Sequence, residues 1–231
     1  MRIGTWNLAH ERNASPMVLK RQLDFMEAAD CDIWLLSEVP YTFRTVTGPS
    51  HTALSDAMDR THSVYAAVWA KAGIDEPLAE IHEAAALARV QGRRVCSSLL
   101  PWHDAPLTHW PDKKGADRAA VMQLAIGRVR AGLSAEQGEL IWGGEWSHAF
   151  AGEDTVTTDE GRQALEEMVG ALGLQLPTAA LAHTEDGGRC TLSQIAVPSG
   201  WNVTSSGRLV AENGEDGRLS RHDAYVVDVE P

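Results

Sequence analysis

Residues 32–39 read DIWLLSEV, and this stretch combines an apolar run typical of a buried strand with the ionisable carboxylate of Glu38. The apolar run within residues 32–36 is short and is bounded by polar residues, which predicts a buried β-strand. Glu38 follows this run after Ser37, at the kind of position where sheet proteins place binding and catalytic groups. The stretch therefore predicts a sheet protein with a site at the ends of its strands.

The same pattern of a buried strand beside a polar residue recurs at three other places. Residues 3–8 predict a strand that contains Asn7, Glu145 follows the apolar stretch IWGG, and His222 precedes a strand predicted at residues 225–229. We expect Asn7, Glu38, Glu145 and His222 to converge at one end of the molecule.

The remaining elements alternate along the chain without an internal repeat. Ser15 followed by Pro16 is a helix start, and a second amphipathic helix is predicted at residues 158–172. The alanine-rich residues 77–89 predict a helix, either as an edge insertion or as a lid. Further strands are predicted at residues 64–69, 95–98, 119–126, 140–142 and 195–197.

Length and composition predict one domain over residues 1–231. The chain is 44% hydrophobic and 23% charged, which is ordinary for a soluble globular protein. No apolar run is long enough to span a bilayer and no secretory signal precedes the first strand, so we expect a cytoplasmic protein without a membrane partner. Three cysteines, Cys31, Cys96 and Cys190, predict reduced thiols and not a disulfide framework.

The formal charge of -12 arises from 20 Lys and Arg against 32 Asp and Glu. A net negative field repels a polyanion. The charge therefore predicts a small-molecule substrate and no binding of bulk nucleic acid.

Five short blocks appear in a fixed order from one end of the chain to the other: IGTWNL, DIWLLSEV, GGEWSHAF, SQIAV and LSRHDAYVVDV. In this order they resemble the endonuclease/exonuclease/phosphatase superfamily, which includes deoxyribonuclease I. The resemblance implies an α/β fold, a four-layer sandwich in which two mixed β-sheets pack face to face with helices outside.

The resemblance also implies a phosphodiesterase or phosphatase site that uses Mg²⁺ or Mn²⁺. It assigns catalytic places to six residues and metal contacts to Glu38 and Glu145. The catalytic set is Asn7, Glu38, Glu145, Ser147, Arg221 and His222.

This site departs from the family pattern at several places. Glu145 and Ser147 stand where the family has Asp and Asn, and Ser193 with Gln194 stands where it has Asp and His. Arg221 replaces an Asp, and a guanidinium repels a divalent cation while pairing well with carboxylates. We therefore expect weak or absent metal binding if Arg221 takes the place of the cation.

Three functions stay open from the sequence. One is a divergent hydrolase acting on a small phosphorylated substrate. Another is a metal-independent enzyme in which Glu38, Glu145 and His222 act as acid and base groups beside Arg221. The third is a non-catalytic binding module. Two site residues also have purely structural interpretations, in which Arg221 points to solvent and His222 is a turn residue. Three tryptophans fit either core packing or an aromatic-lined pocket: Trp6, Trp142 and Trp146.

Overall fold

Two six-stranded sheets form the centre of the molecule in the computed structural model. The structure describes residues 1–9, 16–58, 63–102, 110, 118–152, 158–183, 190–212 and 217–231. Within these residues, the first sheet runs in the spatial order β11 (Asn202–Leu209), β12 (Ala224–Glu230), β1 (Arg2–Asn7), β2 (Ile33–Pro40), β4 (Ser63–Ala70) and β3 (Thr52–Leu54). The second runs β5 (Glu76–Pro77), β6 (Ala85–Val90), β7 (Arg93–Ser98), β8 (Leu140–Glu145), β10 (Ser193–Pro198) and β9 (Leu174–Gln175).

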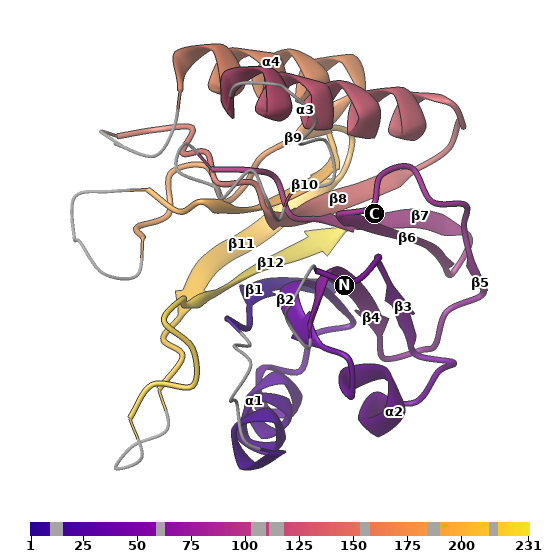
Figure 1. Cartoon of the computed structure of the whole chain (residues 1–231), viewed down its shortest axis with the longest axis vertical. Helices are drawn as coiled ribbons and strands as arrows, with labels where there is room; N and C mark the ends of the chain where they lie inside the picture. The colour runs from indigo at the N-terminus through magenta and orange to yellow at the C-terminus, as the bar shows by residue number, and fades with distance from the viewer. Residues whose placement is uncertain are drawn as a thin grey trace.

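Helices cover the outer faces of both sheets, as Figure 1 shows. α1 (Pro16–Ala29) and α2 (Phe43–Thr47) lie on the side of the first sheet, whereas α3 (Arg118–Ser134) and α4 (Asp159–Ala171) lie over the second. The result is a four-layer α/β sandwich with mixed sheets, because β1–β2 and β7–β8 are parallel pairs and the other strand pairs are antiparallel. No helix in the described part of the chain combines the length and apolar character needed to cross a membrane.

Successive side chains of each strand point to opposite faces of its sheet, and the side chains that face the other sheet form the core between the two. Ile3, Leu35 and Val68 of the first sheet pack with Ile141 and Ile195 of the second, and all five are buried. Residues of opposite parity, such as Trp34 in β2, face the helical layer instead. Strands buried on both faces read as nearly continuous apolar runs, which is why they stand out in the sequence.

Two predicted elements are wrong. Residues 77–89 predict a helix, but the structure has β5, a connection and the start of β6 there. Ala85, Ala86 and Ala88 are buried in β6, so the alanines are small sheet residues and not helix formers. Residues 119–126 predict a strand but belong to α3, where Val121, Ala125 and Val129 recur every four residues on its buried side.

Candidate active site

Six residues named by the sequence lie around one pocket of about 270 Å³ at the end of the sandwich. They reach it from the ends of β1, β2 and β8 and from the segment before β12. The lining consists of Asn7, Glu38, Leu99, Trp102, Glu145, Ser147, His183, Leu192, Arg221 and His222. The topology therefore brings together side chains that are more than 200 positions apart in sequence.

Asn7 and Glu38 face each other because β1 and β2 are parallel and in register, with Asn7 opposite Ser37. The Asn7 side-chain amide donates to Glu38 Oε1 over 2.9 Å, and its Oδ1 accepts from the Ala9 backbone N–H. Glu38 has a φ of +48°, in the left-handed region that non-glycine residues rarely adopt. Backbone strain of this kind concentrates at functional positions, where the surroundings must hold it in place.

Glu145 is positioned by the glycines that precede it in β8. Gly144 has a φ of +116°, which turns β8 where its pairing with β7 ends, while it stays paired with β10. The Glu145 backbone N–H then donates to Ser37 Oγ, so the two sheets are joined directly at the site. Glu145 as a whole is only 5% exposed, and its carboxylate accepts a 2.6 Å hydrogen bond from the Ser193 hydroxyl on the neighbouring strand β10.

Burial raises the pKa of the Glu145 carboxyl above its ordinary value. The Ser193 hydrogen bond, the nearby charges of His183 and Arg221 and the Asn7 amide offset part of this effect. A carboxylate whose charge is poorly solvated gains more from accepting a proton than a surface carboxylate does. The environment thus favours Glu145 as a proton acceptor.

The raised pKa of Glu145 makes a prediction about stability. Between the ordinary carboxyl pKa and the raised native pKa, the folded protein keeps the Glu145 proton and the unfolded chain has lost it. The free energy of unfolding of the wild type therefore decreases as pH rises through this range. Glu145→Gln has no carboxyl group at this position, so its free energy of unfolding does not decrease for this reason. We expect its melting temperature, relative to the wild type, to increase from pH 4 to pH 8 in thermal unfolding followed by circular dichroism. A difference that stays constant or decreases with pH would contradict a raised pKa.

Ser147, His222 and Arg221 complete the predicted set. Ser147 is buried with a φ of +56°, and its hydroxyl donates to the Leu100 carbonyl. His222 is fixed through its backbone, because its carbonyl accepts from Trp6 Nε1 and its N–H donates to Ser220 Oγ. The Arg221 side chain is 59% exposed, and its Nη2 lies 3.9 Å from Glu38 Oε2.

Four further residues line the pocket and were not predicted from the sequence: Leu99, Trp102, His183 and Leu192. All four come from connections between elements, where no strand or helix period identifies a side chain as facing a pocket. By contrast, Trp6, Trp142 and Trp146 are fully buried, and the ring centroids of Trp142 and Trp146 lie 3.9 Å apart. These three tryptophans are core residues.

In the described part of the chain, the candidate ligands for a divalent cation at this pocket are the Glu38 and Glu145 carboxylates. Mg²⁺ and Mn²⁺ prefer several converging oxygen ligands. Among the described residues, no group of three or more His, Cys, Asp and Glu side chains is placed to hold a metal ion. The Glu38 carboxylate accepts a hydrogen bond from the Asn7 amide and lies 3.9 Å from the Arg221 guanidinium. The Glu145 carboxylate accepts a hydrogen bond from the Ser193 hydroxyl. The described residues thus offer the metal implied by the sequence resemblance two carboxylates, and one of these two lies 3.9 Å from a guanidinium.

Neither a protein-family model nor a curated protein sequence matches the chain. Solved structures do match it. A 3′ phosphatase from Neisseria bound to product DNA hairpin aligns over 100% of both chains, with a TM-score of 0.73 and 14% identity. An endonuclease/exonuclease/phosphatase family protein from Leptotrichia buccalis also aligns over 100% of both chains, with a TM-score of 0.62 and 13% identity. This chain has the endonuclease/exonuclease/phosphatase fold. The catalytic domain of Xenopus laevis APE2 shares this fold too, with a TM-score of 0.68 and 12% identity over 99% of this chain and 91% of that one.

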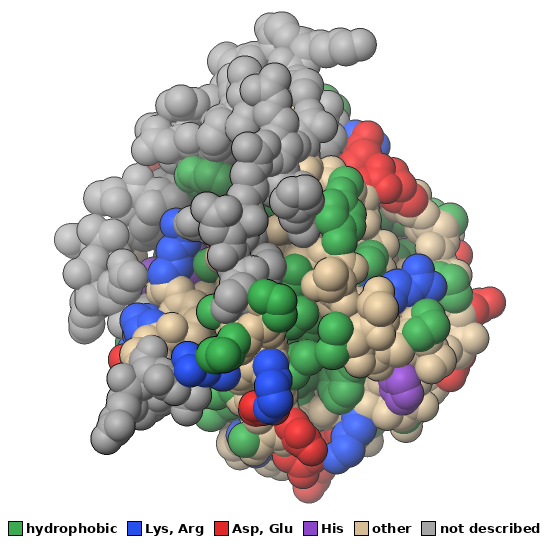
Figure 2. Space-filling model, turned by 60° about the horizontal axis from the view of Figure 1, so that its bottom comes forward, with side chains coloured by type: hydrophobic (Ala, Val, Ile, Leu, Met, Phe, Trp, Pro, Cys, Tyr) green, Lys and Arg blue, Asp and Glu red, His purple; other side chains and the backbone are tan. Residues whose placement is uncertain are grey.

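The prediction that bulk nucleic acid is not a partner is contradicted by these comparisons, since a protein with the endonuclease/exonuclease/phosphatase fold is bound to a DNA hairpin. The physical reason is that net charge sums over the whole surface. At physiological salt a phosphate senses charges within about 8 Å, so a distant excess of acids is largely screened. Figure 2 shows cationic and anionic side chains interspersed with hydrophobic ones on one face, rather than a uniformly acidic surface.

Proposed function

We propose that the chain is a phosphoester hydrolase that works at this pocket without a divalent cation. The observation that carries the proposal is the convergence of Glu145, Arg221 and His222, which supplies a proton acceptor, a fixed cation and an imidazole around one cavity. The fold that the chain shares with the solved 3′ phosphatase from Neisseria supports the choice of reaction.

Arg221 is the proposed phosphate ligand. Its guanidinium is exposed and meets Glu38 only at 3.9 Å, so it is available to a ligand. Exposed ion pairs of this length contribute little to stability. Guanidinium and phosphate form paired hydrogen bonds, and a cation at this position stabilises the negative charge that develops on the phosphoryl oxygens.

Glu145 is the proposed base for hydrolysis. A water molecule gives a proton to the Glu145 carboxylate while the oxygen of that water forms a bond to phosphorus. The ester P–O bond breaks at the same centre, and the leaving oxygen takes a proton from the His222 imidazolium. Asn7 and Ser193 hold Glu38 and Glu145 through the hydrogen bonds described above.

The substrate is proposed to present one phosphate and its adjoining unit to the pocket. A volume of about 270 Å³ accommodates one phosphate with its adjoining unit. The terminal unit of a DNA strand and a small phosphorylated molecule share this chemistry, and the DNA hairpin bound by the Neisseria phosphatase supports testing the strand first.

The test is turnover of three probes in EDTA: a DNA hairpin with a 3′-phosphate, p-nitrophenyl phosphate and bis-p-nitrophenyl phosphate. We expect phosphate or nitrophenol release from at least one probe, and a KM that rises roughly tenfold or more in Arg221→Gln, as for loss of a charged contact. Arg130→Gln, which removes an exposed guanidinium on α3, is the matched control. Absence of turnover on all three probes, or an unchanged KM in Arg221→Gln, would overturn the proposal.

A further inference from the structure

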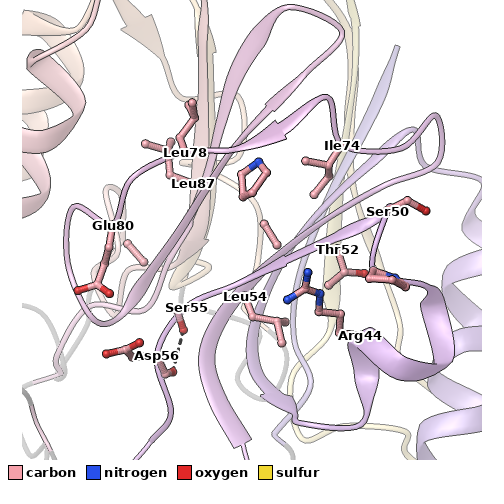
Figure 3. Close-up of a pocket in the computed structure, with 14 residues that line it drawn as sticks. Arg44, Ser50, Thr52, Leu54, Ser55, Asp56, Ile74, Leu78, Glu80 and Leu87 are labelled. Carbon is pink, nitrogen blue, oxygen red and sulfur yellow. Dashed lines mark hydrogen bonds between the residues drawn. The ribbon is translucent and has the colours of Figure 1, made fainter.

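A second pocket, of about 370 Å³, lies at the lateral edge of the sandwich and shares no residue with the candidate active site. It opens between the edge strand β3 of the first sheet and the β5–β6 edge of the second. Figure 3 shows its walls, with Thr52 and Leu54 on one side and Leu78 and Leu87 on the other. Its volume lies in the range of small-molecule sites, and the proposed hydrolysis makes no use of this place.

Residues 74–83 close this pocket at both ends of β3. The Ile74 N–H donates to the Ser50 carbonyl over 2.7 Å, and the Asp56 N–H donates to the Glu83 carbonyl over 3.1 Å. Ser50 and Asp56 lie six positions apart, which is about 20 Å along an extended strand. The chain itself therefore bounds the length of the pocket, and this suits a small molecule that lies along β3 between the two hydrogen bonds.

Main-chain groups of β3 face the pocket between these two hydrogen bonds. In an antiparallel ladder, alternate residues bond to the partner strand and those between them point away from it. The Ser55 N–H donates to a carbonyl of β4, whereas the Ser50 carbonyl and the Asp56 N–H bond on the opposite side. Thr52 and Leu54 have the same parity as Ser50 and Asp56, so their N–H and C=O groups point toward the pocket. A ligand that lies there meets main-chain donors and acceptors.

The floor of the pocket is apolar. Ala53 of β3 and Ala85 and Leu87 of β6 line it and are buried, and the half-buried Ile74 and Leu78 extend this surface. Two of these residues are alanines, whose small side chains leave space that methylene groups of a ligand can fill. Removing such groups from water is favourable, so the floor favours a ligand with an aliphatic chain.

Opposite charges lie at separate places on the rim of the pocket. Figure 3 shows the Arg44 guanidinium on one side, with Asp56 and Glu80 on the other and Leu54 between them. These three charged residues are exposed, and none forms an ion pair with another described residue. Two carboxylates beside one guanidinium disfavour a dianionic phosphate. The rim instead matches a ligand with one carboxylate and one ammonium group.

We propose that this pocket binds a small linear zwitterion with an amide in its middle. The carboxylate of the ligand pairs with Arg44, and its ammonium group meets Asp56 and Glu80. The amide N–H of the ligand donates to the Leu54 carbonyl, and the methylene groups on either side of the amide pack against the apolar floor. An ω-amino acid joined through an amide to a second ω-amino acid has this chemistry.

The probe for this test is the linear amide dimer of 6-aminohexanoate, titrated into ¹⁵N-labelled full chain and followed by amide chemical shifts. Its extended length stays below the roughly 20 Å between the two closing hydrogen bonds. We expect saturable shifts of the Thr52 and Leu54 amides, because both N–H groups face the pocket. Because the readout is binding, the result does not depend on whether the chain hydrolyses phosphoesters.

Three copies of the probe each lack one contact. In the first the amide is N-methylated, in the second the amine is acetylated, and in the third the carboxylate is replaced by a carboxamide. We expect each copy to bind roughly threefold or more weakly than the probe, as for loss of one exposed contact. Arg44→Gln should weaken the probe by a similar factor and leave the affinity of the carboxamide copy unchanged. Arg130→Gln, on α3, should change neither affinity.

Three outcomes would overturn the proposal. The first is the absence of saturable shifts at Thr52 and Leu54. The second is an affinity for the acetylated and carboxamide copies equal to that for the probe, which would show that the charged rim takes no part in binding. The third is equal affinity for the N-methylated copy, which would show that no hydrogen bond to β3 forms. These comparisons use the wild type, so a folding defect in Arg44→Gln leaves the proposal testable.

Discussion

Glu145→Gln is expected to lower kcat/KM for phosphoester hydrolysis by about 10²–10⁴, the usual contribution of a positioned general base. The amide is nearly isosteric with the carboxylate and retains an oxygen that can accept the Ser193 hydrogen bond, but it cannot take a proton from water. The loss should fall on kcat, because Arg221 still binds the phosphate. The measurement is initial rate against substrate concentration for both proteins, with the probe that turns over best.

Glu166→Gln is the matched control, since this carboxylate lies exposed on α4, outside the pocket. We expect its kinetics to equal those of the wild type. If Glu145→Gln retained wild-type kcat, the base would have to be another group, and the role given to the buried carboxylate would be wrong.

Gly144→Ala is expected to destabilise the fold by about 2–5 kcal/mol, combining strain from the positive φ with overpacking. An added Cβ would collide with the backbone carbonyl oxygen of Ser98 in the adjacent segment. The φ of +116° is unfavourable for alanine even without that contact. Because Gly144 directs Glu145 into the site, the same change should also displace the carboxylate.

Thermal unfolding measures this effect, with an expected fall in Tm of roughly 5–15 °C for a chain of this size. Gly170→Ala is the contrasting variant, since Gly170 lies in α4 and an added Cβ meets nothing within 4 Å. In a helix this change should stabilise by about 0.5–1 kcal/mol. A Gly144→Ala protein as stable as the wild type would show that neither the turn nor the close approach to Ser98 constrains this position.

The fold could be predicted because its central strands are apolar on both faces and each is followed or preceded by a polar residue. Residues 32–39 illustrate this, since Ile33 and Leu35 pack between the sheets, Trp34 faces the helical layer, and Glu38 lies at the pocket. β6 was missed because its alanines satisfy both a helical and an extended pattern. Only tertiary packing, in which small side chains fit between two sheets, distinguishes the two.

The polar residues next to strands could be predicted to lie together because parallel register fixes Asn7 beside β2 and antiparallel register fixes Glu145 opposite Ser193. His183 could not be predicted, since it lies in a connection without any periodic pattern. Nor could the partner of Glu145 be derived from spacing. The 2.6 Å Ser193 hydrogen bond depends on β8 and β10 pairing, although the two residues are separated by 48 positions.

The most direct test of a hydrolase without a divalent cation is a calorimetric titration of Mn²⁺ into the wild type and into Arg221→Asp/Glu145→Asp, with phosphoester turnover measured in EDTA alongside. We expect no saturable Mn²⁺ binding by the wild type and turnover that EDTA leaves unchanged. The double variant, which removes the guanidinium and places two shorter carboxylates at the pocket, is expected to gain saturable binding. Stoichiometric Mn²⁺ binding by the wild type, with turnover abolished by EDTA, would contradict it.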